Sequence, residues 1–529
     1  MANEEAARAF REIAALIELK GESPFQARAY QRAADEIERA GDLVRLAREG
    51  RLTELPGIGK GLADKIASFV ATGSIPMLGE LRKEIPSGVV ELSRIPGLGP
   101  GRIRTMREAI GVESPEDLGR ALEEGNLSGV KGFGPKVLED LRRAFAYWKG
   151  TRALRLHRIA REDADAVLAA LLGLGAKEAA IAGDLARWLE VVGDLSLVAS
   201  HPRPADLLAS ATGRLPGSRV EGDTLLFTGG SGLPGRLRVV PPPVFGAALA
   251  LATGAPDHIA SLVRLAGERS LVLDENGLRR GEETIPAPDE ASFYAHLGLP
   301  LLPPEVREGT GEIDLALRGP LPGLLVRGDI RGVVHVHTTW SDGAASIREM
   351  AERAAAIGFE YLAIADHSRS AGYAGGLSAE RLLAQGEEIR SIEGEMAPFR
   401  IFHGVESDIL ADGTLDYPDE TLERLDFVVS SVHSRFGLPR EEQTARIAAA
   451  VRNRFTTVLG HPSGRLLLSR EPYDFDANAV WDAAAKAGTA IELNAHEERL
   501  DVDWREIGKL RKRGIPIWIG SDAHAPAEM

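Results

Sequence analysis

The sequence predicts a multidomain α and α/β protein, with an all-helical N-terminal region and a C-terminal barrel of strands and helices. Three observations lead to this prediction. A glycine-containing turn occurs three times within the first 150 residues, each time before a helical pattern. Short apolar strands alternate with helical patterns from about residue 330 onward. The length of 529 residues also exceeds what a single hydrophobic core supports, since chains longer than about 250–300 residues usually divide into domains.

The composition excludes several classes of protein. No apolar run approaches the roughly 20 residues that a membrane span requires. The N-terminus "MANEEAARAFREIAAL" lacks the basic start and apolar stretch of a signal peptide. We therefore expect a cytoplasmic protein, a monomer with no membrane partner. The chain contains no cysteine, so any metal ion must be held by histidine and carboxylate side chains.

Charge is distributed unevenly along the chain. The net charge of −15 argues against a protein that binds nucleic acid over its whole surface. The first 150 residues hold 23 basic and 23 acidic side chains and are therefore neutral, while the remainder of the chain carries the whole deficit. We expect any contact with DNA to be local and to lie in the N-terminal region.

The repeated turn combines an apolar residue, a Gly-apolar-Gly triplet and a basic helix, and its three copies align without gaps. They are "LTELPGIGKGLADKI" (52–66), "LSRIPGLGPGRIRTM" (92–106) and "LSGVKGFGPKVLEDL" (127–141). Glycine permits the tight turn, and backbone N–H groups at the start of the second helix can bind a phosphate oxygen. Three copies in one frame disfavour the alternative that each turn merely joins two helices. The segments resemble the helix-hairpin-helix motifs of DNA repair proteins, which implies DNA contacts at Gly57, Gly59, Lys60, Gly97, Gly99, Gly132, Gly134 and Lys136.

The middle of the chain resembles a polymerase. After three such hairpins, "AGDLARWLEVVGDLSLVAS" is similar to the palm of bacterial family X DNA polymerases, and residues 235–254 and 297–309 are similar to the end of the palm and to the thumb. The resemblance covers about residues 1–320. It implies a lyase-like helical domain at 1–80, a fingers-like region at 81–150, a palm at 151–242 and a thumb at 243–318.

The palm departs from the family pattern where the chemistry should lie. A Gly-Ser turn is expected at the triphosphate, and an Asp-x-Asp pair and a third carboxylate at the two metal ions. The chain instead has Gly183-Asp184, then a single arginine of the expected pair, Arg187, then Trp188 in place of a glycine, then Asp194-Leu195-Ser196, and finally Arg236. Two-metal phosphoryl transfer needs clustered carboxylates. We therefore expect the palm metals to be absent and polymerase activity to be lost, unless Glu190 or Asp223 compensates.

Lys65, in the second helix of the first hairpin, matches the position of the Schiff-base lysine in the lyase domains of family X polymerases. The resemblance implies a catalytic role for it. The alternative is an ordinary solvated lysine, because the surrounding sequence offers no evident way to lower its pKa.

Seven apolar strand patterns follow a Gly- and Pro-rich boundary at residues 310–330. They lie at residues 332–337, 360–368, 399–408, 425–434, 456–464, 489–495 and 515–524, with helical patterns between them. Such alternation predicts parallel strands, and seven sequential units predict a (β/α)7 barrel. Active sites of such barrels lie at the C-terminal ends of the strands.

Polar residues follow nearly every one of these strands. The set comprises His335, His337, Asp342, His367, Glu406, His433, His461, Asp522 and His524. Imidazole and carboxylate together suit zinc, manganese or iron. Nine groups exceed the roughly four to six ligands of one ion, so we expect two to three divalent ions. We interpret His403 and His496 as structural residues.

Residues 330–529 resemble the PHP (polymerase and histidinol phosphatase) domain in the motifs "HVHTTWSDG", "ADHS", "GVESDI", "SVHS", "GHPSG" and "GSDAH". The resemblance implies that Glu406 bridges two ions. It assigns His335, His337 and Asp522 to one site, with His433 beside the bridge, and the other ligands to the remaining sites. A metal-bound hydroxide would attack phosphorus. The candidate phosphate clamps, each of which could instead be a solvated surface residue, are Arg435, Arg465 and Arg499.

These features together predict a DNA repair enzyme that binds gapped, nicked or 3′-ended DNA and hydrolyses it in the barrel. The resemblance implies 3′→5′ exonuclease, 3′-phosphatase or abasic-site cleavage, with manganese or zinc. The alternatives are a gap-filling polymerase with an attached nuclease, a non-catalytic DNA-binding scaffold, and a small-molecule phosphatase. The altered palm argues against the first, the complete ligand set against the second, and the three hairpins against the third.

Overall fold

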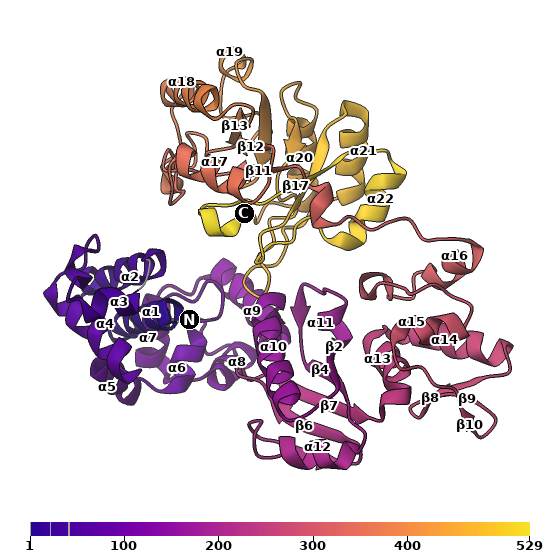
Figure 1. Ribbon diagram of the computed structural model, residues 1–529. Coiled ribbons are helices and arrows are strands. Elements are labelled where there is room, and N and C mark those ends of the chain that lie inside the picture. The colour runs from indigo at the N-terminus through magenta and orange to yellow at the C-terminus, as the bar shows by residue number, and fades with distance from the viewer. Residues whose placement is uncertain (1, 22, 41–42) are drawn as a thin grey trace. The chain divides into compact units, whose positions relative to one another are not determined.

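The computed structural model describes residues 2–21, 23–40 and 43–529 (Figure 1). The chain divides into two compact units, Met1–Arg152 and Ala153–Met529. Within the described ranges, no helix is both long and apolar enough to cross a membrane. The predicted multidomain architecture, with helical hairpins first and a parallel barrel last, is confirmed.

The first unit is built from helices around one apolar core. Helices α1 and α2 pack against each other, and the ring of Phe10 lies 5.7 Å from that of Tyr30. The helices are α1 Ala2–Lys20, α2 Pro24–Arg39, α3 Leu43–Arg48, α4 Lys60–Thr72, α5 Pro76–Glu84, α6 Ser87–Leu92, α7 Pro100–Ile110, α8 Pro115–Glu124 and α9 Pro135–Thr151. Each of the three predicted hairpins leads into one of the longer ones, namely α4, α7 and α9.

The second unit begins with a five-stranded sheet in the order β2-β4-β7-β6-β5. Strands β4 and β7 run parallel and the other neighbours run antiparallel. The elements are β1 Arg155–Leu156, α10 His157–Gly173, β2 Glu178–Ala182, α11 Gly183–Ala186, β3 Val191–Val192, β4 Leu195–Ser200, α12 Pro204–Ala211, β5 Arg219–Glu221, β6 Thr224–Thr228 and β7 Pro234–Val240.

A small helical domain with a three-stranded sheet follows. Its core surrounds a buried hydrogen-bonded group, in which His258 lies between Glu312 at 2.5 Å and the Tyr294 hydroxyl at 3.0 Å. The elements are α13 Phe245–Thr253, α14 Pro256–Glu268, β8 Val272–Asp274, β9 Gly277–Arg280, β10 Glu283–Thr284, α15 Glu290–His296 and α16 Glu312–Arg318.

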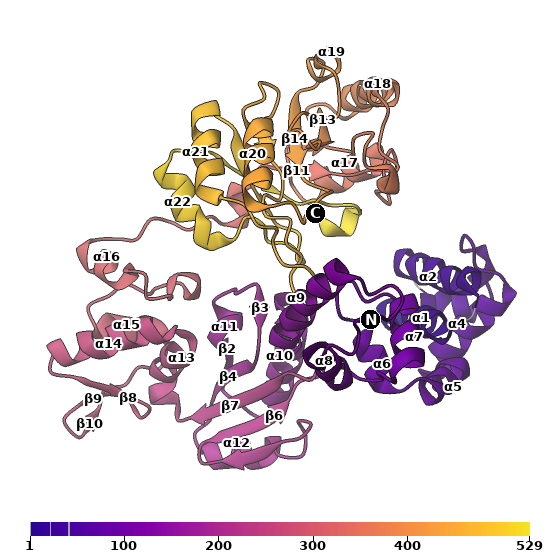
Figure 2. The ribbon, with the colours of Figure 1, turned by 180° about the vertical axis from the view of Figure 1, so that it is seen from behind.

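The last part is a barrel of seven parallel strands in sequential order, β11 to β17, with helices outside it (Figures 1 and 2). A parallel bridge between Val336 and Ala523 brings the first and last strands together. The strands are β11 Gly332–Val336, β12 Tyr361–Ile364, β13 Arg400–Asp408, β14 Phe427–Ser431, β15 Val458–Leu459, β16 Ala490–Asn494 and β17 Ile517–Gly520. The helices are α17 Ile347–Ala356, α18 Ala379–Met396, α19 Asp419–Leu422, α20 Arg440–Val451, α21 Ala477–Ala487 and α22 Ile507–Lys512.

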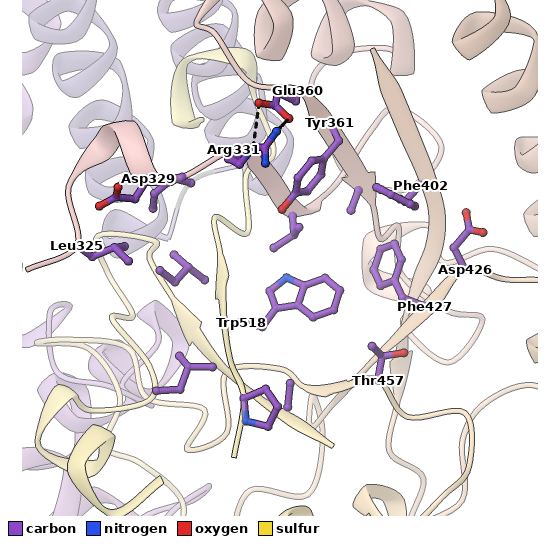
Figure 3. A pocket seen from close by; sticks show the side chains of 18 residues that line it. Leu325, Asp329, Arg331, Glu360, Tyr361, Phe402, Asp426, Phe427, Thr457 and Trp518 are labelled. Carbon is purple, nitrogen blue, oxygen red and sulfur yellow. Dashed lines mark hydrogen bonds and ion pairs between the residues drawn. The ribbon is translucent and has the colours of Figure 1, made fainter. Parts of the chain in front are cut away.

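The two mouths of the barrel differ in chemistry. The amino ends of the strands surround a cavity of about 840 Å³ that is lined mostly by apolar side chains, some of them aromatic (Figure 3). Tyr361, Phe402, Phe427 and Trp518 contribute rings to it, and an ion pair between Arg331 and Glu360 lies at its rim. The polar and ionisable side chains predicted from the sequence lie at the other mouth, after the carboxyl ends of the strands.

Candidate functional site

The barrel brings all nine predicted ligands together. They come from the carboxyl ends of six strands and the loop after β11, so the parallel topology predicted from the sequence is what makes them converge. Ligand atoms lie within 4.8 Å of one another in four groups, which are His337–Asp342–His367–His524, His335–His337–Asp522, His335–Glu406–His461 and His367–Glu406–His433. Glu406 belongs to two of these groups, which fits the predicted bridging role.

Backbone strain is concentrated at the same residues. His335, His461 and Asp522 have positive φ angles of 58°, 21° and 53°, which residues other than glycine rarely adopt. Surrounding structure must enforce such conformations, and they are characteristic of functional sites.

The donor atoms fit divalent metal ions. His335, His337 and Glu406 have no solvent exposure. Nε2 of His335, both ring nitrogens of His337 and Oε2 of Glu406 are buried and have no hydrogen-bond partner among the described residues. Buried polar atoms normally have a partner, and imidazole and carboxylate atoms that face one another without a hydrogen bond suit a divalent cation bound between them. The clusters could therefore hold metal ions.

Carboxylates behind the candidate ligands fix their orientation. Glu492 lies 2.5 Å from Nδ1 of His335 and accepts the backbone N–H of His461 at 2.6 Å. Asp408 lies 2.6 Å from Nδ1 of His433. A carboxylate on Nδ1 keeps the proton there and leaves Nε2 free to bind a metal. Sequence reasoning missed both carboxylates, although a glutamate within the apolar strand "TAIELNA" is a signal that could have revealed Glu492.

The histidines and carboxylates of the cluster shift one another's pKa values. Burial, reinforced by the nearby His367 and His524, lowers the pKa of His337 to about 3. Burial also acts to lower the pKa of His367, but the charges of Glu406 and Asp342 outweigh it and raise that pKa to about 10. Although burial opposes ionisation of Glu406, the surrounding histidines hold its pKa well below the ordinary value. The site therefore favours a charged carboxylate at the predicted bridge.

The three predicted clamp arginines lie in different environments. Arg499 is one-fifth exposed and its Nε lies 3.0 Å from Asp522, so it reaches the metal cluster. Arg465 is largely buried and donates to the carbonyl oxygens of Arg499 and Leu500, which makes it a support for Arg499. Arg435 is exposed and has a φ of 58°. Their roles toward phosphate remain predictions.

The two histidines predicted to be structural lie outside the metal groups. His403 is buried and its backbone N–H donates to Asp426. Burial lowers the pKa of His403 to about 4, so it is neutral at physiological pH. Nδ1 of His496 accepts the backbone N–H of Glu498.

The three hairpins of the first unit share one geometry. The first glycine of each pair has a positive φ, namely 71° at Gly57, 76° at Gly97 and 89° at Gly132. The second glycine of each pair is an extended N-cap at the start of α4, α7 or α9, a conformation that any residue can adopt. A Cβ built on any of the six glycines meets nothing within 4 Å. Internal packing therefore does not require the second glycines, and the open space in front of them is compatible with the predicted approach of a phosphate.

The three lysines of this unit that the sequence singles out lie in two different environments. Lys60 and Lys136 are exposed at the starts of α4 and α9, where a phosphate can reach them. Lys65 is half-buried, donates to the carbonyl of Gly61 at 3.1 Å, and has its Nζ 5.9 Å from the centre of the Tyr30 ring. A catalytic role for Lys65 stays a prediction.

Arginine ion pairs occupy the altered palm positions. Asp194 pairs with Arg236, and the strand register places Arg236 beside Ser196. Asp184 accepts from Arg187 at 2.7 Å, and Gly183 lies close to Ser196. Residues 153–242 are all described, and they contain no metal-type group of three carboxylates or histidines.

The possible compensating carboxylates are also paired with arginines. Glu190 accepts from Arg505 at 2.7 Å, and Asp223 accepts from Arg238 at 2.9 Å. Asp184, Asp194, Glu190 and Asp223 thus each have an arginine of the protein beside them.

The fold and the barrel site define a class of protein, in which helical hairpins, a palm and a thumb precede a barrel that could hold several metals. Family models agree with this description. A helix-hairpin-helix domain matches residues 1–75, a tandem of such hairpins 89–146, the DNA polymerase beta thumb 248–308 and the PHP domain 334–496.

Comparison with curated proteins extends the match over the whole chain. The DNA polymerase/3′-5′ exonuclease PolX of Bacillus subtilis (strain 168) is 36% identical over 98% of this chain and 91% of its own length. The chain therefore belongs to the family X DNA polymerases that carry a C-terminal PHP domain. Two proteins named as probable phosphatases match the barrel alone. That of Acetivibrio thermocellus is 32% identical over 37% of this chain and 80% of its own length, and that of Caldicellulosiruptor bescii is 31% identical over the same shares.

Proposed function

We propose that this protein binds DNA through its hairpins and hydrolyses phosphoester bonds at 3′ ends in the barrel, with two to three manganese or zinc ions. The observation that carries the proposal is the convergence of nine ligand-type side chains at one mouth of the barrel, several of them buried with unpaired donor atoms. The name of the Bacillus relative includes a 3′-5′ exonuclease, which supports the same direction and end preference.

In this proposal, separate groups of residues bind the ions, orient the ligands and orient the phosphate. His335, His337 and Glu406, together with the other six ligand candidates, would hold the ions. Bound ions would supply an activated water and neutralise charge on the phosphoryl oxygens. Glu492 and Asp408 would keep the imidazole Nε2 atoms deprotonated toward the centre. Arg499, one-fifth exposed beside Asp522, would orient the scissile phosphate by donating hydrogen bonds.

We further propose that the palm has lost polymerase activity. A two-metal site needs carboxylates that are free to bind cations, whereas Asp194 pairs with Arg236. Asp184 puts a negative charge at the turn expected to hold a triphosphate, and Arg187 is committed to Asp184, Glu308 and the carbonyl of Thr253. Arg187 thereby ties the palm to α13, and we infer a structural role for the former nucleotide site.

The second candidate is a gap-filling polymerase with an attached nuclease. The name of the Bacillus relative favours it, because that name includes DNA polymerase. The two candidates differ in whether Asp194 or His337 is required. An enzyme acting on chromosomal DNA works in the bacterial cytoplasm, so the predicted location forms part of the same proposal.

The test uses a 5′-labelled gapped duplex with Mn²⁺, wild-type protein and the variants His337→Ala and Asp194→Ala. We expect 3′ shortening by the wild type, a loss of more than about 100-fold in His337→Ala, and wild-type rates in Asp194→Ala. The exposed thumb variant Val272→Ala is the matched control for handling and folding. Shortening that persists in His337→Ala would remove the barrel as the site of hydrolysis.

A further inference from the structure

Two of the six tryptophans are exposed, and both lie in the second unit. Trp188, between α11 and β3, is 60% exposed, and Trp504, before α22, is 39% exposed. The ring of Trp188 stacks on His157 with centroids 4.7 Å apart and an angle of 9° between the planes. The guanidinium of Arg505 lies 4.6 Å from the centre of the Trp504 ring. Both rings are thus held in place while a large part of each stays accessible.

The two tryptophans flank a single ion pair. Glu190, two residues after Trp188, accepts a hydrogen bond from Arg505, the residue after Trp504, at 2.7 Å. Glu190 is buried, and side chains from two distant parts of the sequence meet there. A second pair, Arg158 with Glu497 at 2.6 Å, joins the neighbour of His157 to the loop after β16. The palm segment and the barrel loop that carry the two rings are therefore tied together.

Packing does not account for Trp188. Its φ is 62°, a conformation that glycine adopts freely and a bulky side chain adopts at a cost. Its ring nevertheless faces solvent, so burial of the indole does not offset the strain. A strained, exposed aromatic residue points to a use for the side chain itself.

A line of linked side chains connects this place to the metal centre. Asp503, next to Trp504, accepts from Arg465 at 2.8 Å. Arg465 in turn donates to the carbonyl oxygen of Arg499 at 2.8 Å. The side chain of Arg499 lies 3.0 Å from Asp522 within the metal cluster. The tryptophans thus stand at the outer end of a chain of hydrogen bonds and ion pairs whose inner end is the candidate metal site.

We propose that Trp188 and Trp504 form a stacking platform for the unpaired bases of a single-stranded DNA 3′ end whose terminus is delivered to the candidate metal centre. Exposed aromatic rings interleaved with arginine are what binding of single strands requires, because every base offers a face for stacking whatever its sequence. Paired bases within a duplex cannot use such a platform. The inference rests on the proposed function, since it supplies the route by which the barrel receives its substrate.

The experiment measures binding without cleavage. Fluorescence anisotropy of a 5′-labelled twelve-nucleotide thymidine strand is recorded in EDTA with wild-type protein, Trp188→Ala, Trp504→Ala and Trp188→Phe. We expect each alanine variant to weaken binding by about 5- to 150-fold, the range for loss of one stacked base, and Trp188→Phe to retain most of the affinity. Leu172→Ala is the matched control, because Leu172 is 54% exposed on α10, the helix that begins at His157.

An abasic strand makes the test specific to stacking. On a strand that carries no bases, wild-type protein and the alanine variants should bind equally weakly. The substitutions should have no effect there, because no base can stack on either tryptophan. The proposal is overturned if the alanine variants, with unchanged melting temperature, bind the thymidine strand as tightly as wild type. It is also overturned if they lose as much affinity for the abasic strand. Because no cleavage is involved, a wild type that fails to shorten DNA would refute the proposed function and leave this result standing.

Discussion

Replacing Glu492 by glutamine tests whether the carboxylates behind the ligands set the affinity for metal. Glu492 is 1% exposed, and its two oxygens face different donors, His335 Nδ1 at 2.5 Å and the backbone N–H of His461 at 2.6 Å. Glutamine keeps one acceptor and puts an NH₂ group in place of the other. If that group faces His335, Nδ1 must accept and the proton moves to Nε2, which then cannot bind a metal. If it faces His461, the buried backbone N–H loses its acceptor.

The expected magnitude follows from the loss of one such contact. Removal of a partner that orients a ligand usually lowers metal affinity by about 10- to 100-fold, equivalent to roughly 1.4–2.7 kcal/mol. Mn²⁺ or Zn²⁺ binding is measured by competition with a chromogenic chelator at pH 7.5. Glu360→Gln serves as the matched control, because Glu360 pairs with Arg331 at the opposite mouth of the same barrel and its side chain is 56% exposed. Wild-type metal affinity in Glu492→Gln, with an intact fold, would refute the reasoning.

Three other outcomes follow from the buried charges. Burial raises the pKa of Asp501 from 3.8 to about 6, so the folded protein binds more protons than the unfolded chain between these values and loses stability as pH rises through that window. Asp501→Asn should therefore unfold in urea with up to about 3 kcal/mol more stability than wild type at pH 8, an advantage that disappears near pH 4. Arg187→Ala should lower the free energy of unfolding by about 3 kcal/mol, because it removes a buried guanidinium and leaves the partly buried Glu308 without its cation; an unchanged denaturation midpoint would contradict the link that Arg187 makes between the palm and α13. Added Mn²⁺ at 100 times its Kd should stabilise the protein by about 2.7 kcal/mol, and no rise in melting temperature would argue against a preformed metal site.

The sequence predicts the convergence of the nine candidate ligands because the topology of the barrel brings them together. In a parallel barrel every strand ends at the same mouth, so a polar residue after each apolar run is enough to place His367, Glu406 and His461 near one another. The same logic does not reach Glu492 or Asp408. These residues lie within strands, and their importance depends on a histidine from a strand elsewhere in the sequence.

In the altered palm, the sequence shows the unusual residues but not all of the partners with which they pair. Asp184 and Arg236 are recognisable in the sequence as the wrong charges for triphosphate and metal ions. Arg236 pairs with Asp194 from a distant part of the sequence. Arg187 pairs with Asp184, three residues before it, and also with Glu308, 121 residues further along the chain. Only the folded structure therefore shows these ion pairs.

The exposed tryptophans illustrate a third case. The sequence shows Trp188 where a glycine is expected, but not the positive φ that makes the substitution costly or the ion pair that brings Trp504 to the same place. Long-range pairing of this kind depends on packing between the palm and the barrel loops, and no local pattern encodes it.

The most direct test of the central claim is the fate of a labelled primer end on a gapped duplex with wild-type protein, Mn²⁺ and all four deoxynucleoside triphosphates. The account predicts shortening of the 3′ end at the same rate with and without the nucleotides, because the barrel hydrolyses DNA and the palm cannot bind its metals. Extension of the primer opposite the gap would contradict it. That result would mean that the arginine ion pairs of the palm open to admit a nucleotide and its metal ions.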